Sequence, residues 1–199
     1  MKKNLLVLLA LSFLNHCGSV PPTYYYRIDY ELPSTNSRND IIPITLGIVQ
    51  FDADILYEGD RIVYRQSPYE VQFYHYRRWI APPKKIVTEK VLNQFRASGF
   101  FQRVVRIPST FNIDYILKGQ INAFEEWDEG NAWYGIVTLV FQLQNTKSNE
   151  IVWENEFSEK TKAMKREPVE VVRAISQSLK KVVQKAIEEI EYNLKYQNI

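Results

Sequence analysis

Three consecutive segments in the second half of the chain alternate between apolar and polar side chains. They span residues 113–125, 133–144 and 151–157, and short polar turns at 128–131 and 145–149 separate them. A period of two is that of a strand with one buried face. Turns of this length join antiparallel neighbours. These segments therefore predict an antiparallel meander, whose apolar face needs a second layer to cover it.

Two helical patterns can supply that layer. The longer one follows Glu167-Pro168: its apolar residues recur every three or four positions, and Lys and Glu fill the opposite face. It predicts one amphipathic helix of roughly 25–30 residues, about 40 Å long. The shorter one opens at Pro82-Pro83, because proline suits the first helical position, and stops at Gly99.

The other strands are shorter. Residues 101–107 form one of them, after the first helix. Those before it cover residues 24–32, 44–51, 61–65 and 70–76, and Ser67-Pro68 turns the last two into a pair. The order of four strands, a helix, four strands and a helix predicts a single α+β domain over residues 24–199. We expect a mixed or antiparallel sheet with both helices packed on one face and a long C-terminal helix.

The N-terminus has the layout of a signal peptide. Two lysines precede the ten-residue apolar run 5–14, which is too short to span a bilayer. The lone cysteine, Cys17, follows at the position where the bacterial lipobox has its lipidated cysteine. Residues 14–17 (LNHC) resemble that motif, although Asn15 and His16 replace its small residues. We expect a lipoprotein signal peptide at 1–16 and acylation of Cys17, for instance with palmitate.

Two alternatives to this lipid anchor are an ordinary cleaved signal peptide, with Cys17 incidental, and an uncleaved anchor. If Cys17 is acylated, residues 17–23 form a short tether, and several acyl chains hold the protein on a membrane without a spanning helix. The protein would then lie in the bacterial cell envelope and face the periplasm. Gly18 stands where many inner-membrane lipoproteins have Asp, which favours the outer membrane.

Charge and length exclude several classes of protein. The chain has 199 residues, the size of one ordinary domain, with 25 basic and 23 acidic side chains. Loss of residues 1–16 removes Lys2 and Lys3 and no acid, which leaves 23 of each sign. A neutral domain lacks the basic surface that neutralises phosphates, so nucleic acid is not an expected partner.

The sequence shows no motif for catalysis. One cysteine and two histidines cannot form a structural zinc site or an internal disulfide, and no nucleotide-binding or serine-hydrolase motif is present. We interpret His75 as a strand histidine with satisfied contacts. The acids between Glu125 and Glu129 are interpreted as solvated groups at a hairpin tip. No enzyme activity, cofactor or metal is therefore expected.

The segment 69–79 (YEVQFYHYRRW) has the composition of an interface, because aromatic residues and arginine dominate binding hot spots. We expect its exit end to bind a partner through Tyr74, Tyr76, Arg77, Arg78 and Trp79. The alternative is a strand with one face in the core and an exposed aromatic ladder on the other. Trp79 is ambiguous, since a Trp before a proline-led helix can also fill the core.

The order of several short motifs resembles the auxiliary lipoproteins of Mce-type ABC lipid transporters, the family of the paraquat-inducible lipoprotein. The motifs are residues 46–49 (LGIV), 61–65 (RIVYR), 78–82 (RWIAP), 87–92 (VTEKVL) and 114–121 (DYILKGQI). With the N-terminal signal, the resemblance covers nearly the whole chain. The sequence departs from the family in two places: the loop 51–58 lacks the usual Pro-x-Tyr-Leu, and 80–83 (IAPP) replaces the commoner Trp-Ala-x-Pro-Leu.

This resemblance implies a periplasmic, non-enzymatic subunit that works with an Mce-domain protein and the transporter's permease complex. Such a subunit helps to move phospholipid-like molecules between membranes, and the family supplies no catalytic residues to carry over. Lipoproteins that assist outer-membrane assembly or activate peptidoglycan synthases have a similar α+β shape and are the alternative. An envelope hydrolase is the alternative from a different class.

Overall fold

The computed structural model describes residues 20–32 and 41–196. The predicted signal peptide and Cys17 lie outside these residues. The elements in chain order are β1 (Tyr24–Tyr26), β2 (Ile42–Ile48), β3 (Asp52–Ala53), the 3-10 helix η2 (Ile55–Tyr57), β4 (Arg61–Ser67), β5 (Glu70–Trp79), α2 (Pro83–Ser98), β6 (Phe101–Arg106), β7 (Tyr115–Glu129), β8 (Ala132–Asn145), β9 (Ile151–Lys162) and α3 (Pro168–Tyr196).

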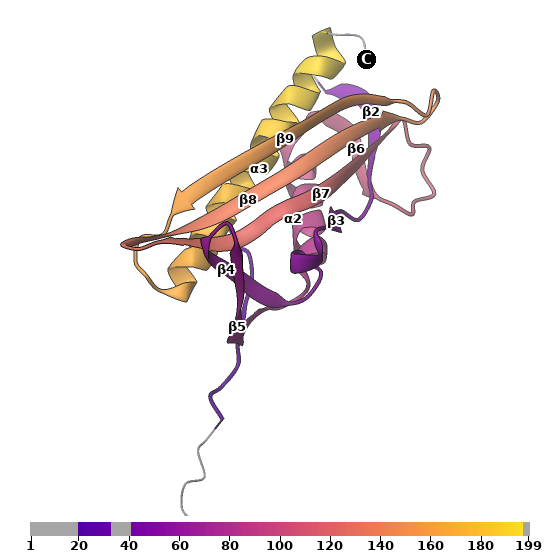
Figure 1. The fold of residues 1–199 in the computed structure, drawn as a ribbon. Coiled ribbons are helices and arrows are strands. Elements are labelled where there is room, and N and C mark those ends of the chain that lie inside the picture. Colours follow the sequence, from indigo (N-terminus) through magenta and orange to yellow (C-terminus); the bar gives the residue numbers. More distant parts are fainter. Residues whose placement is uncertain (1–19, 33–40, 197–199) are drawn as a thin grey trace, which may run out of the picture.

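The predicted meander is confirmed. β8 pairs with β7 and with β9, in both cases antiparallel, and the three strands form the long curved ribbon of Figure 1. Along β8 the buried side chains alternate with partly exposed ones, and the buried set is Val137, Leu139, Phe141 and Leu143. β9 runs on to Lys162, five residues beyond the alternation that predicted it.

The helix α3 covers the buried face of this meander. Its apolar stripe is almost fully buried, including Ile175, Leu179, Val182 and Ile190. Gly135 on β8 permits the close approach, since a Cβ there would lie 2.3 Å from the backbone nitrogen of Ile175. The predicted length is confirmed, because α3 has 29 residues.

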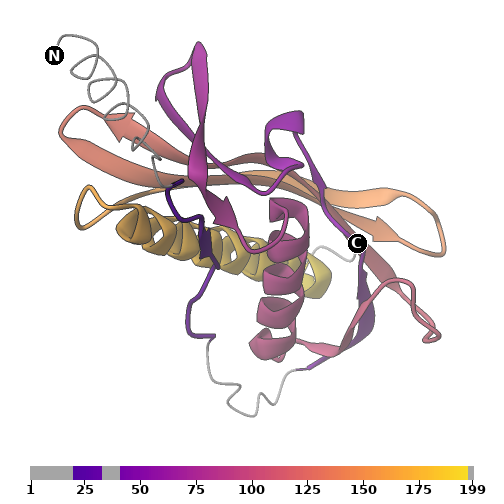
Figure 2. The same cartoon turned by 90° about the horizontal axis from the view of Figure 1, so that it is seen from below.

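The helix α2 packs on the same side of the sheet as α3 (Figure 2). It starts at Pro83 and is capped after Ser98 by Gly99, whose φ of 69° is the left-handed conformation that glycine adopts most easily. The Gln94 side chain joins the two helices by donating to the Lys180 carbonyl at 2.8 Å. The predicted α+β class, with both helices on one face, is confirmed.

The remaining strands make the sheet mixed. Within the described ranges all nine strands belong to one sheet. β4, β2 and β3 each pair parallel with β7, and β6 extends the sheet parallel to β2.

The sequence predicted no strand or helix for residues 52–60, whereas the structure has β3 and η2 there. Asp54 caps η2 by accepting from the Leu56 N–H at 3.0 Å.

The predicted strand at residues 24–32 is shorter than expected, because only Tyr24–Tyr26 is a strand. Residues 27–32 instead cross the helices as a segment that we call the strap. Its Ile28 is 3% exposed, the Asp29 N–H donates to Ser176 Oγ of α3 at 3.2 Å, and the Tyr30 hydroxyl donates to Gln94 Oε1 of α2 at 3.0 Å. The alternation in the sequence reflects these inward contacts rather than pairing in a sheet.

No helix within the described residues is both long and apolar enough to cross a membrane.

Candidate functional site: the β4–β5 hairpin

The antiparallel pair β4–β5 projects from the sheet on the side away from the two helices (Figures 1 and 2). β4 holds the hairpin to the sheet by pairing parallel with β7, with Val63 opposite Glu125 and Tyr64 opposite Glu126. The register within the hairpin slips between Arg61 and Val63, so β5 is longer than β4. The hairpin is therefore joined to β7 through β4, and β5 lies one strand further out and carries the exposed side chains of His75 and Tyr76.

Glu125 fixes the hairpin on one face of β7. It is 2% exposed and accepts from the Tyr57 hydroxyl at 2.5 Å. The Arg65 guanidinium of β4 donates to the same carboxylate through Nε at 2.9 Å and pairs with it through Nη2 at 2.8 Å. Burial, followed by the contact with Glu125, raises the pKa of Tyr57 well above its usual range, so the phenol stays protonated and donates. This buried ion pair ties η2, β4 and β7 together.

Glu126 fixes the hairpin on the opposite face, since adjacent strand residues point in opposite directions. It is 1% exposed and accepts from the Tyr74 hydroxyl of β5 at 2.9 Å. The Tyr74 ring lies on that of Tyr64, with centroids 4.7 Å apart. Burial raises the pKa of Glu126 to about 7; the Tyr74 hydrogen bond opposes this, and the nearby Asp128 adds to it.

These contacts correct the interpretation of the acidic segment. Glu125 and Glu126 were expected to be solvated at a hairpin tip, but β7 continues past them and turns only after Glu129. Both carboxylates are buried, because the β4–β5 hairpin covers them. Glu129 is exposed, as expected, and pairs with Lys160. The sequence contains no local signal for this burial, since the partners come from residues 57–74.

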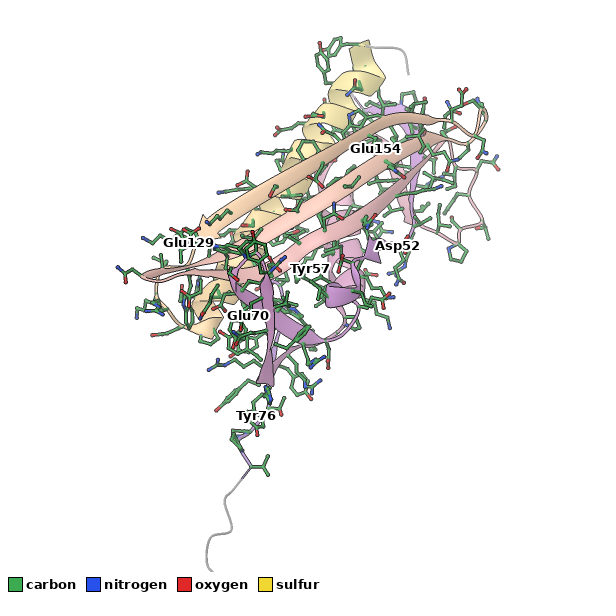
Figure 3. The ribbon with its side chains drawn as sticks, in the orientation of Figure 1. Asp52, Tyr57, Glu70, Tyr76, Glu129 and Glu154 are labelled. Carbon is green, nitrogen blue, oxygen red and sulfur yellow. The ribbon has the colours of Figure 1, made fainter. Side chains whose placement is uncertain are left out.

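The predicted partner residues are divided between the surface and the core. Tyr76 is 42% exposed and directly precedes the residues of β5 that pair with β1; Figure 3 labels it at the lower end of the hairpin in that view. The Arg77 guanidinium lies over the Tyr74 ring, 4.8 Å from its centroid, and Arg78 pairs with Asp60 at 2.8 Å. These four side chains form the exposed and half-buried surface that we call the hairpin surface: Tyr74, Tyr76, Arg77 and Arg78.

Trp79 does not belong to that surface. It is 1% exposed, and its ring packs against Phe124 at a centroid distance of 5.0 Å. A side chain so deeply buried has no area to offer a partner, so Trp79 fills the core and leaves the predicted docking set. Its indole N–H has no hydrogen-bond partner among the described residues.

His75 is exposed and lies beside Tyr76, with ring centroids 6.3 Å apart. It is therefore a strand histidine on β5, as expected, and its side chain is exposed. Within the described ranges no three His, Cys, Asp or Glu side chains are grouped to hold a metal ion.

The sequence did not predict that β1 pairs with β5. The pairing is parallel, with Tyr24 opposite Arg77, Tyr25 opposite Arg78 and Tyr26 opposite Trp79. It places the first residues of the domain directly beside the hairpin surface. Pairing across fifty residues leaves no local trace in a sequence, and only the run of tyrosines indicated a strand.

Comparison with known proteins agrees with this architecture. A protein from Xanthomonas campestris of the DUF330 family superposes with a TM-score of 0.73 at 21% identity, covering 86% of this chain and 95% of that one. An uncharacterized protein superposes with a TM-score of 0.67 at 14% identity, covering 85% of this chain and 99% of that one. A hypothetical protein from Chlamydia trachomatis superposes with a TM-score of 0.50 at 5% identity, covering 76% of this chain and 97% of that one. At such identities the likeness concerns the fold alone.

No curated protein matches the chain. The sequence model of one family matches residues 26–186, which include the hairpin, α2, the meander and the first two thirds of α3. This match agrees with the resemblance found in the sequence at the level of the transport auxiliary family. The chain belongs to the ABC-type transport auxiliary lipoprotein component family.

Proposed function

We propose that this protein is a non-catalytic, lipid-anchored subunit of an Mce-type ABC transport system that moves phospholipid between membranes. The family match over residues 26–186 carries the proposal, because its description names both an ABC-type transport system and a lipoprotein. Acylation of Cys17 would hold the chain on the periplasmic side of the outer membrane. The hairpin surface would then bind the Mce-domain subunit that works with the permease complex.

The structure of the hairpin supports a binding role. Glu125 and Glu126 hold it from both faces of β7 through Arg65 and Tyr74, so both strands of the hairpin are held in place before a partner arrives. Preorganised surfaces lose less conformational entropy on binding. Tyr76 offers a large ring that is 42% exposed, and Arg77 is stacked on Tyr74 rather than free to move. Aromatic and arginine side chains in such positions carry much of the energy of interfaces.

A pull-down with the cognate Mce-domain protein tests the docking surface. Tyr76→Ala and Arg77→Ala should each weaken binding by on the order of 2 kcal/mol while the melting temperature stays close to wild type. Trp79→Ala should instead lower stability by roughly 3–5 kcal/mol, because it empties a core site. Lys147→Ala, in the turn at the opposite end of the molecule, is the matched surface control. Wild-type binding by both hairpin variants would exclude this surface.

The anchor and the absence of catalysis are tested separately. Mass spectrometry of protein purified from membranes should show an acylated peptide that begins at Cys17, and Cys17→Ser should release the protein. A mature chain that starts at another residue would contradict the anchor.

His75→Gln should retain transport-linked function, since the exposed ring has no grouped nucleophile; a folded but inactive His75→Gln protein would support an enzyme instead.

A further inference from the structure

The chain enters the domain at β1, beside the base of the hairpin. The backbone carbonyl of Tyr26 accepts from the Ile80 N–H at 2.8 Å, which brings Ile80 next to the entry point. Tyr24 stands seven positions after Cys17, and a fully extended chain spans at most about 3.3–3.6 Å per residue, so the entry point lies within about 25 Å of an acyl anchor at Cys17.

An apolar groove opens at this entry point, between the strap and the start of α2. Its volume is about 250 Å³, and its apolar wall is formed by Ile28, Ala81 and Ile86. Ile80 stands on its rim and is 67% exposed. An exposed isoleucine over an apolar groove leaves hydrocarbon in contact with water, which is unfavourable unless another surface covers it.

Cations surround the groove. Arg27, Lys85 and Lys90 line it together with one acid, Glu89, and Glu89 is paired with Arg106 of β6. Asp29 is the other nearby acid; its Oδ1 lies 3.5 Å from Arg27 Nη2 and 3.9 Å from Lys90 Nζ. Three lysine and arginine side chains thus face two acids, and one of those acids is already neutralised from outside the groove. The rim retains positive charge, and the Arg27 side chain is 72% exposed.

Two exposed tyrosines complete the surface. Tyr24 and Tyr25 are 57% and 64% exposed and belong to β1, the strand that leads into the strap. Tyrosine rings favour the headgroup level of a bilayer, where the phenol meets water and the ring meets hydrocarbon. Apolar, aromatic and cationic side chains therefore meet where the anchor would bring a membrane closest. We call this set the membrane-side patch: Tyr24, Tyr25, Arg27, Ile80 and Lys85.

We propose that the membrane-side patch lies on an anionic phospholipid bilayer, with Ile80 inserted at the boundary between headgroups and acyl chains and Arg27 and Lys85 bound to phosphate groups. This inference rests on the proposed acylation of Cys17, and it adds an orientation that acylation alone does not fix. A flexible tether permits any orientation, whereas the patch selects one face of the domain. It adjoins the hairpin surface at Ile80, so the test leaves the hairpin residues unchanged.

The test places a fluorescent probe on the full, lipid-anchored chain. Cys17 is the single cysteine and is blocked by acylation, so Ile80→Cys provides one thiol for an NBD label. Lys147→Cys in the β8–β9 turn is the control, since both views place that turn at the other end of the molecule from β1 (Figures 1 and 2). In vesicles of phosphatidylethanolamine and phosphatidylglycerol that carry a doxyl-labelled lipid, the probe at residue 80 should be quenched at least about twofold more than the probe at residue 147.

The charge is tested by Arg27→Glu with Lys85→Glu. On phosphatidylglycerol vesicles, this double variant should lose the extra quenching at residue 80. On neutral phosphatidylcholine vesicles, quenching at residue 80 should be the same with and without the two charge reversals. Equal quenching at residues 80 and 147, or no effect of charge reversal, overturns the inference while the chain still floats with the vesicles. A chain that does not float and carries no acyl group overturns the proposed anchor and, with it, this inference.

Discussion

Glu126 carries a carboxyl group that is almost fully shielded from water, at 1% exposed. Burial raises its pKa from 4.5 to about 7, so the native state binds a proton more tightly than the unfolded chain does. The resulting stability is fully present below pH 4.5 and is lost as the pH rises through 7. The difference is on the order of 3 kcal/mol. The native state is therefore destabilised at the pH where Glu126 is charged.

Glu126→Gln should remove this pH dependence. The amide is neutral at every pH and still offers Oε1 to the Tyr74 hydroxyl, so we expect the variant to exceed wild-type stability at pH 8 and to match it at pH 4. Urea unfolding at the two pH values measures the difference. Glu129→Gln is the control, since that side chain is 46% exposed on the same strand and should leave the slope unchanged. A Glu126→Gln protein with the wild-type slope would show that another group titrates.

The contact between α3 and β8 depends on the absence of a side chain at Gly135. A Cβ there would lie 2.3 Å from the nitrogen and 2.7 Å from the Cγ1 of Ile175, and the glycine carbonyl accepts from Ser178 Oγ at 2.9 Å. A helix backbone cannot rotate aside as a side chain can. Gly135→Ala should therefore move α3 away from the sheet and cost roughly 1–3 kcal/mol, as overpacked cores do.

Chemical denaturation of Gly135→Ala beside Gly59→Ala measures this cost. Gly59 has open space around its Cβ position, with no atom within 4 Å, so its replacement should change stability by less than about 0.5 kcal/mol. Equal stability of the two variants would mean that β8 and α3 can move apart without lowering the free energy of unfolding. The strand then would not require glycine at residue 135.

Elements defined by a local period were predictable. Residues 133–144 and the stripe of α3 show periods of two and of three to four, and these periods follow from which face is buried. The turn at Ser67-Pro68 and the end of α2 at Gly99 were predictable for the same reason, because local backbone geometry selects those residues. The predicted boundaries were less accurate where pairing extends a strand beyond its alternation, as in β9.

Features that depend on distant partners were not predictable. The parallel pairing of Val63 with Glu125 joins residues 62 positions apart, and it is this pairing that brings the hairpin over the two acids. The composition of segment 69–79 indicated an interface, but no local pattern separates Tyr76, which is exposed, from Trp79, which lies in the core. The strap has the alternating pattern of a strand because Ile28 points inward. It is not a strand, because the pairing of β1 with β5 ends at Tyr26 and Trp79.

Across the whole molecule, the strap joins the entry of the chain to both helices. Tyr30 donates to Gln94 of α2, the same Gln94 donates to the Lys180 carbonyl of α3, and Asp29 reaches Ser176 of α3. A pull on the N-terminus would therefore be transmitted to the helical layer and not only to the three residues of β1. This is a suitable connection for a domain that the proposed lipid anchor would hold at one end.

Two truncations test the role of the strap. Removal of residues 1–23 should leave the melting temperature near that of the full chain, because Val20 is 80% exposed and β1 starts only at Tyr24. Removal of residues 1–32 should cost roughly 3–6 kcal/mol, since it uncovers the site of Ile28, breaks the bonds to Gln94 and Ser176, and also removes the pairing of β1 with β5. Ile28→Ala in the intact chain should account for about 2–5 kcal/mol of this loss. Equal melting temperatures of the two truncated proteins would show that neither β1 nor the strap stabilises the helical layer.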